Sequence, residues 1–407
     1  MMRYFLSIIL CHLTIFLDAQ KSVSTDDLLF GNLNVISTEN SEAVLELPQF
    51  GALSIVDKWE FRTETDEWDF SRQEYTLRAS FNGFSSKNIY NEINNVNRET
   101  FLLFEKQYHE NAIFQKYKSI VELYYLQQKN MLADSLLIIL KDKKAIVDFE
   151  IANGSSSNIN ELVNIDFAIR EIGIDQNTYE FKKKLLLQQL GVNSDANQFL
   201  IDTTAWIRNI TIIDVLAIND VNLNSEINLK SQKLKYRNLE LERQNSEAKR
   251  ILDFAQLKYA GRNQLTALNE FSVGFGINIP TKSSNIRKRS EALVDKLEDE
   301  LELKQIKANV YQEIEELIFK IKMKNLEYNS YDKYIREIES SKTSMSFDLY
   351  SDPNSGLEYK LNNLKLHKDI LNIENQLVED YLELLMIKGW FLYYPDVNFL
   401  SDNFKLD

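Results

Sequence analysis

Few residues of this chain could carry out covalent chemistry. The sequence holds a single cysteine, Cys11, and only three histidines, of which His109 and His367 lie in long stretches with helical periodicity. A histidine in such a stretch is more often solvated or packed between helices than a ligand. The 61 acidic residues make pairs of carboxylates inevitable, and solvated helix faces account for them. We therefore expect no enzymatic reaction, no cofactor and no metal site.

The charge balance bears on the class of partner. The formal net charge is −14 and the pI is near 5.0. Nucleic-acid backbones are bound by basic surfaces, so the composition argues against a nucleic-acid partner. One basic cluster, residues 283–289 (SSNIRKR), follows a predicted strand. It could bind lipid headgroups, and a charged first turn of a helix is the alternative.

Residues 1–19 have the pattern of a secretory signal peptide. Arg3 supplies the positive charge, an apolar run follows, and Ala19 offers a cleavage site before Gln20. An uncleaved membrane anchor is the alternative, although the run is short for a span. A lipoprotein signal would place a small residue before Cys11, where this chain has Leu10. Because Cys11 lies within the segment, the mature chain would contain no thiol.

The clearest strand pattern lies at residues 271–279. Large apolar side chains alternate there with small or polar ones, which is the period of a strand with one apolar face. The predicted apolar positions are Phe271, Val273, Phe275, Ile277 and Ile279. A partner strand near 251–259 completes a strand pair over 251–281, and residues 47–84 contain a second strand hairpin.

The rest of the chain has the pattern of long helices. With only 11 Gly and 4 Pro among 407 residues, few turns are available. Helices are predicted at 86–148, 158–190, 212–250, 286–346 and 355–388. Gly191 and Gly389 are expected to end two of them. Breaks fall at 149–157 and 347–354, and the aromatic tail 390–407 is expected to pack on the helices.

The two halves of the chain repeat each other. Residues 149–164 (FEIANGSSSNINELVN) align with residues 347–362 (FDLYSDPNSGLEYKLN) at an offset of 198. Each half reads as a strand hairpin, a long helix, a break and a shorter helix. We therefore divide the chain into a short N-terminal segment (20–46), a first repeat (47–191) and a second repeat (192–389).

This order of elements resembles the TolC-like outer-membrane efflux proteins. LPQFGALS (47–54) is similar to the family's entry into its first strand, and FSVGFGINIPTKSSNIRKR (271–289) to its entry into the second long helix. Phe149, Gly154, Ser157 and Leu162 are similar to the pattern at the family's helical tips. The resemblance covers about residues 47–388.

The resemblance implies a mainly α fold with a β-barrel end. Long α-helical hairpins would form a coiled-coil shaft, and four strands per subunit would join a trimeric twelve-stranded barrel. A homotrimer in the cell outer membrane, with a long periplasmic extension, would meet a periplasmic adaptor protein and an inner-membrane transporter. It would be a passive conduit for efflux or secretion. The strand with the apolar positions given above would face lipid.

The same resemblance implies roles for the tips. Adaptor contacts would involve Phe149, Gly154, Ser157, Asn160, Phe347 and Ser355. The family often has two acidic residues one turn apart that narrow the tunnel. Here Glu358 occupies the first position and Leu361 the second. Glu358 could line such a constriction, and an ordinary acid in the first turn of a helix is an equal alternative.

Two alternative functions are a periplasmic scaffold and a periplasmic adaptor. Only about 27 residues separate Gln20 from Pro48, too few for the family's first helix and an N-terminal segment. A non-transporting periplasmic coiled-coil scaffold with the same fold is therefore the alternative function. A periplasmic adaptor would have one helical hairpin between small β-domains, whereas this pattern has two hairpins.

Overall fold

A computed structural model describes residues 21–30, 56–65, 73–81, 86–154, 159–192, 199–202, 206–216, 224–248, 252–260, 271–277, 282–349 and 353–402. The chain folds into two units, and each draws on both halves of the sequence. We call residues 38–107 and 224–309 the sheet unit. Residues 1–37, 108–223 and 310–407 form the helical unit. The predicted signal peptide lies outside the described residues.

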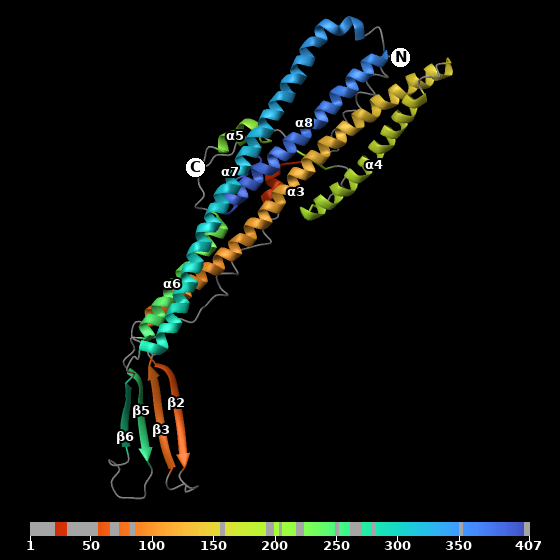
Figure 1. Cartoon of the computed structure of the whole chain (residues 1–407). Coiled ribbons are helices and arrows are strands. Elements are labelled where there is room, and N and C mark those ends of the chain that lie inside the picture. The colour runs from red at the N-terminus through yellow and green to blue at the C-terminus, as the bar shows by residue number, and fades with distance from the viewer. Residues whose placement is uncertain are drawn as a thin grey trace. The chain divides into compact units, whose positions relative to one another are not determined.

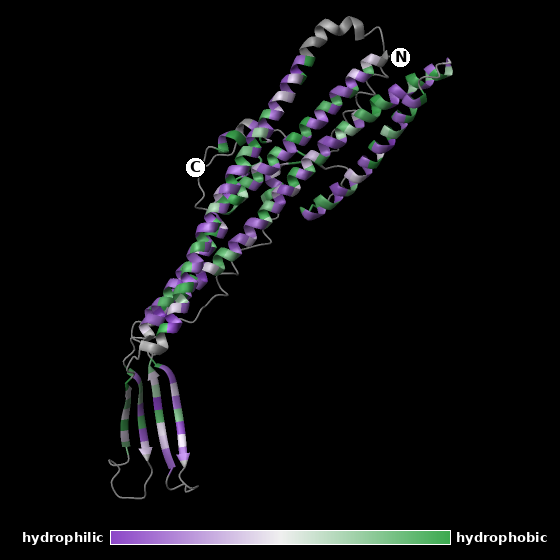
Figure 2. Ribbon diagram, viewed as in Figure 1, coloured by the Kyte–Doolittle hydropathy of each residue, from purple (hydrophilic) through white to green (hydrophobic). Residues whose placement is uncertain are grey.

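The described residues of the sheet unit include a four-stranded antiparallel sheet. Its strands are β2 (Val56–Thr65), β3 (Gln73–Phe81), β5 (Leu252–Ala260) and β6 (Phe271–Ile277), in the order β2-β3-β5-β6 (Figure 1). The central pairing joins β3 to β5. The strand pairs from the two repeats therefore form a single sheet. Bands of opposite hydropathy alternate along these strands (Figure 2).

Among the described residues, three helices contribute to the sheet unit. They are the first part of α3 (Ser86–Ala152), all of α6 (Ser225–Ala248) and the first part of α7 (Lys282–Leu349). Ile93, Val96 and Leu239 form a small apolar core between α3 and α6. The buried Asp299 of α7 accepts a hydrogen bond from Lys230 at 2.8 Å. Burial alone would raise the pKa of Asp299, but the lysine contacts outweigh it and lower that pKa.

The helical unit contains the remainder of α3 and α7 with α4 (Ile159–Gln189) and α8 (Pro353–Lys388). Short elements complete it: β1 (Lys21–Val23), α2 (Thr25–Phe30), β4 (Phe199–Ile201), α5 (Asn209–Leu216) and α9 (Trp390–Tyr393). β1 pairs with β4 in parallel. In the described part of the chain, no helix combines the length and apolar character needed to cross a membrane.

The aromatic tail packs against α3, as the sequence predicts. The Tyr117 ring lies 4.8 Å from the Phe391 ring and 6.3 Å from the Phe399 ring, measured between centroids. The Tyr117 hydroxyl donates to the carbonyl of Val397 at 2.8 Å and accepts from the amide of Phe399 at 3.2 Å. Asn398 donates to Thr25 and Asp26, each at 2.7 Å. The tail thus joins α3 to the N-terminal segment.

The prediction of one continuous helix at 212–250 is wrong. Two helices occupy this region, α5 and α6, and Asn224 between them is not helical. The Asn224 side chain accepts a hydrogen bond from the amide of Ile227 at 3.0 Å. This is an N-cap, which favours a new helix start over continuation.

The helical breaks are shorter than predicted. α3 continues to Ala152, so Phe149 lies in its last turn rather than in the break at 149–157. α7 continues to Leu349, so Phe347 is also helical, and α8 begins at Pro353. Proline at the first helical position loses no hydrogen bond, because that amide would be unpaired anyway. Ser157 and the side chain of Phe347 lie outside the described residues.

Two predicted helix ends are confirmed. Gly191 has φ 71° and follows α4, while the amides of Gly191 and Val192 donate to the carbonyls of Gln188 and Leu187. This pair of bonds is a Schellman motif, which favours glycine because of its positive φ. Gly389, with φ 73°, follows α8, and its amide donates to the carbonyl of Met386 at 2.9 Å. Both glycines therefore end the helices that the sequence predicts.

We predict that Tyr117→Phe destabilises the helical unit. The variant keeps the ring contacts but leaves the buried amide of Phe399 without its acceptor, which costs about 1–3 kcal/mol. Tyr393→Phe, at an exposed tyrosine of the same tail, is the matched control. Urea unfolding followed by circular dichroism measures both. Equal midpoints for the two variants would contradict the role assigned to the Tyr117 hydroxyl.

Candidate functional site

The sheet has one apolar face. The pairing places Trp59, Ala79, Ala255 and Phe275 side by side across the four strands, and Phe61, Leu77, Leu257 and Val273 in the next row. We call this side of the sheet the apolar face. Its large exposed side chains are Trp59, Phe61, Leu77, Leu257, Phe271, Val273, Phe275 and Ile277. Contiguous exposed apolar surface of this kind marks an interaction site.

The apolar face carries a row of aromatic rings. Phe61, Tyr75, Tyr259 and Phe271 come from the four strands in order, and successive ring centroids lie 6.0, 6.3 and 4.8 Å apart. Direct pairing of Tyr75 with Tyr259, and of Tyr259 with Phe271, aligns the rings across the sheet. Phe61 pairs with Leu77 rather than with Tyr75, so the rings cross the whole sheet with Phe61 one row away from the other three.

The opposite side of the sheet is polar and charged. Glu60 bonds Lys58 at 2.9 Å and Arg62 at 3.1 Å, and Lys258 pairs with Glu74. Both signs of charge are present, so most of the charge on this polar face is locally balanced. Four strands with opposite faces of this kind can separate an apolar medium from an aqueous one.

Two glycines of β6 make room for large side chains on the polar face. A Cβ built at Gly276 would lie 2.2 Å from Phe254 Cε1, inside the ring's van der Waals contact. The Arg78 guanidinium carbon stands 3.7 Å from the centroid of the same ring. A Cβ at Gly274 would meet the flexible end of Gln256 at 2.9 Å. The Phe254 ring can therefore lie flat over Gly276, with Arg78 stacked on it.

The predicted lipid-facing residues of β6 share the apolar face. Phe271, Val273, Phe275 and Ile277 are all more than half exposed. Ile279, the fifth, lies outside the described residues. Whether this face contacts lipid stays a prediction.

The tip residues are brought together only in part. Gly154 follows α3 with φ 97°, and its amide donates to the carbonyl of Ile151 at 3.0 Å. Asn160 lies exposed in the first turn of α4, and Ser355 in the first turn of α8. Phe149 is 69% exposed, which leaves its ring available to a partner. Contact of these residues with an adaptor stays a prediction.

Lys143 connects three helices near the tips. Its ammonium lies 2.8 Å from Glu161 of α4 and 3.1 Å from Glu358 of α8, and its side chain is only 10% exposed. Burial lowers the pKa of Lys143, but the two glutamates outweigh burial and leave that pKa raised. The predicted constriction residue Glu358 is therefore paired within its own chain. Its role in a constriction stays a prediction.

Leu361 of α8 lies in an apolar environment. It packs against the apolar cluster of Leu140, Val147 and Ile165, which joins α3 to α4. A carboxylate at this position would be partly buried among aliphatic side chains. Packing therefore explains leucine at the position where the resembling family often has an acid.

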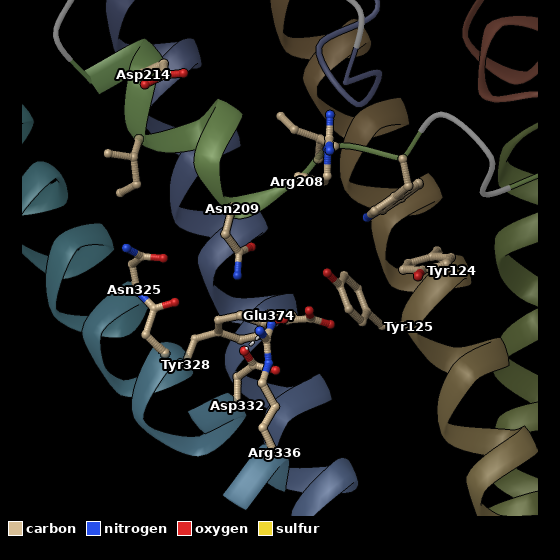
Figure 3. A pocket seen from close by; sticks show the side chains of 14 residues that line it. Tyr124, Tyr125, Arg208, Asn209, Asp214, Asn325, Tyr328, Asp332, Arg336 and Glu374 are labelled. Atoms are coloured by element: carbon tan, nitrogen blue, oxygen red, sulfur yellow. Dashed lines mark ion pairs between the residues drawn. The ribbon is translucent and has the colours of Figure 1, made fainter. Parts of the chain in front are cut away.

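A pocket of about 600 Å³ lies in the helical unit, between α3, α5, α7 and α8 (Figure 3). Aromatic rings, carboxylates, amides and two arginines line it, including Tyr124, Tyr125, Trp206, Arg208, Asn209, Asp214, Asn325, Tyr328, Asp332, Arg336 and Glu374. Burial raises the pKa of the Glu374 carboxyl, and a hydrogen bond from Tyr328 opposes that rise only in part. Burial next to Glu374 raises the pKa of Tyr124 and Tyr328 to about 12.

Sequence reasoning missed Lys143 and the pocket. Lys143 falls between Leu140 and Val147, at spacings of three and four, so it occupies an apolar stripe. A charge within such a stripe was a signal that a buried partner exists. The pocket had no comparable signal, because its lining comes from four elements far apart in sequence. In the described residues, no group of three or more histidine, cysteine, aspartate or glutamate side chains could hold a metal ion.

Comparison with known proteins rests on structure. No protein-family model and no curated protein sequence matches the chain. The Campylobacter jejuni CmeC outer membrane channel is similar over 83% of this chain and 78% of its own, with 12% identity and a TM-score of 0.56. The Vibrio cholerae outer membrane protein VceC is similar over 82% and 85%, with 13% identity and a TM-score of 0.57.

The chain has the fold of the TolC-like outer-membrane channels. The open state of the Neisseria gonorrhoeae MtrE outer membrane channel is also similar, over 83% of this chain and 81% of its own, at 11% identity and a TM-score of 0.56. The resemblance predicted from the sequence is thus confirmed for the fold.

We predict that Lys143→Met destabilises the helical unit of this TolC-like fold by about 1–2 kcal/mol, because two carboxylates near the tips lose their shared donor. Since the pKa of Lys143 is raised on folding, its contribution is complete below the ordinary lysine pKa of about 10.4 and is lost as pH rises through the raised value. Urea unfolding between pH 7 and pH 11 measures this difference.

Lys144→Met is the matched control. Lys144 pairs with Asp166 at 2.6 Å, but both side chains are substantially exposed and screened by solvent. We expect a smaller loss than for Lys143→Met. An equal loss at the two positions would mean that burial of Lys143 does not strengthen its pairs.

Proposed function

We propose that this chain is a subunit of an outer-membrane channel, a passive conduit from the periplasm to the exterior. The observation that carries the proposal is the sheet with an exposed apolar face and a charged opposite face. Such a sheet suits a barrel wall with lipid outside and water inside. The TolC-like fold supports the same reading.

Strand length agrees with this proposal. β2, β3 and β5 have 10, 9 and 9 residues. A tilted strand needs about 9–11 residues to cross the hydrocarbon region. The aromatic row from Phe61 to Phe271 would then lie at a membrane–water interface, where barrels carry girdles of aromatic side chains.

The sheet edges support a closed homotrimer. Within the described residues, β2 and β6 each pair with one strand only. Unpaired edges are unfavourable in a membrane, since no water satisfies their amides and carbonyls. β2 and β6 run antiparallel, so β2 of one subunit can pair with β6 of the next. Three such subunits would close a barrel of twelve strands.

The helical unit would supply the periplasmic extension. In this proposal the residues near the two breaks (Phe149, Gly154, Ser157, Asn160, Phe347 and Ser355) contact a periplasmic adaptor, with an inner-membrane transporter beyond it. The transporter would provide the energy, and the conduit would catalyse no reaction. Opening would rearrange the helix ends there. Glu358 would leave Lys143 in that step, while Glu161 keeps the ammonium paired.

We predict that Phe275→Lys blocks assembly in the outer membrane, whereas Gly274→Lys does not. A lysine among lipid chains at mid-membrane costs about 2–4 kcal/mol. Position 274 lies on the polar face, where a lysine stays hydrated once the Gln256 side chain moves aside. The measurement is the amount of trimer in outer-membrane extracts before and after heating. Equal yields from both variants would contradict the lipid-facing assignment.

We predict discrete channel events when the purified protein is reconstituted in planar bilayers. A water-filled lumen continuous through the barrel gives stepwise current, whereas a scaffold with the same fold would give none. Chemical cross-linking of the same sample reports whether trimers are present. Trimers that never conduct would contradict the conduit and favour the scaffold.

A further inference from the structure

The pocket between α3, α5, α7 and α8 shares no residue with the sheet or with the tip contacts. Its volume of about 600 Å³ lies within the range of sites for drug-sized molecules. Tyr125, Tyr328 and Glu374 enter it from three different helices (Figure 3). Such convergence of polar side-chain groups and aromatic rings from separate elements is typical of ligand sites.

The charges of the pocket favour a cation. Both arginines that line it are already paired, Arg208 with Asp402 and Arg336 with Asp332, the latter at 2.8 Å. Glu374 and Asp214 remain, and no cation pairs with either of them among the described residues. The Tyr328 hydroxyl beside Glu374 lowers the pKa of that carboxyl but, being neutral, adds no positive charge. The pocket therefore offers uncompensated negative charge beside rings.

The rings of the pocket suit the same ligand. Tyr124 stacks on Trp206 with centroids 4.0 Å apart, and Tyr125 stands edge-on to Tyr124 at 4.8 Å. Tyr125 is only 3% exposed, so its position is fixed by packing. An aromatic face attracts a positive charge, and it does so more strongly when water is excluded. Rings next to a carboxylate bind bulky, weakly hydrated cations better than metal ions, which need several oxygen ligands.

We propose that this pocket binds a monovalent organic cation of the quaternary-ammonium class. Glu374 supplies the counter-charge, and Tyr124, Tyr125 and Trp206 supply the aromatic contacts. Binding would join α3, α7 and α8 through one ligand, so occupancy should stabilise the helical unit. The proposal does not depend on conductance, since the pocket lies within one chain.

The test titrates the purified full chain with acetylcholine, a chemical probe for a quaternary ammonium group. Its neutral carbon analogue, 3,3-dimethylbutyl acetate, has nearly the same shape. Calorimetry should give an affinity at least ten-fold higher for the cation. Equal affinities, or no heat from the cation at millimolar concentration, would overturn the proposal. This comparison uses the unaltered protein, so it does not depend on the folding of any variant.

Variants locate the site. Glu374→Gln should lower the affinity for the cation about ten-fold or more and leave the affinity for the neutral analogue unchanged. This is the effect expected of a close charge pair away from bulk water. Trp206→Leu should lower the affinity for the cation about 2–30-fold, because an aromatic face is lost. Glu379→Gln is the matched control, because Glu379 is exposed on the same helix and lies outside the pocket. Equal effects of Glu374→Gln and Glu379→Gln would place any binding elsewhere, and circular dichroism checks that both variants fold.

Discussion

The structure depends on one constraint, the alternation of apolar and polar side chains along four strands that pair in register. The alternation keeps rows such as Trp59, Ala79, Ala255 and Phe275 on one face. A slip of one residue in any pairing would move that strand's apolar side chains to the charged face. Water is a poor solvent for the resulting face, since apolar surface costs about 25 cal/mol per Å² exposed. The sheet therefore specifies its surroundings as well as its own register.

The helical unit relies on a different principle, in which segments distant in sequence form hydrogen bonds with one another. Tyr117 of α3 bonds two backbone groups of the C-terminal tail, and Asn398 of that tail bonds α2. β1 adds to β4 beside them. None of these short segments has enough apolar surface to fold alone. Their positions are fixed because each supplies a hydrogen bond that another would otherwise lack.

The parts that could be predicted from sequence are those with local causes. The apolar positions of β6 follow from period two, and the ends of α4 and α8 follow from Gly191 and Gly389. The break before α6 was missed because it is marked by a single side chain, Asn224, which caps the new helix. Lys143 and Glu358 are 215 residues apart, and Tyr125 and Glu374 are further apart still. Such pairs depend on tertiary packing, which local periodicity does not encode.

The arrangement around Lys143 follows from the cost of leaving a buried charge unpaired. An ammonium with two carboxylate partners stays paired when it loses one of them, whereas an ammonium with a single partner would be left unpaired. Glu358 is the more exposed of the two partners, so water can solvate it when α8 separates from α3. Glu161 remains on α4, which the cluster of Leu140, Val147 and Ile165 holds against α3. Separation of α8 is therefore less costly than separation of α4, so the contact between the two halves of the chain is the weaker one here.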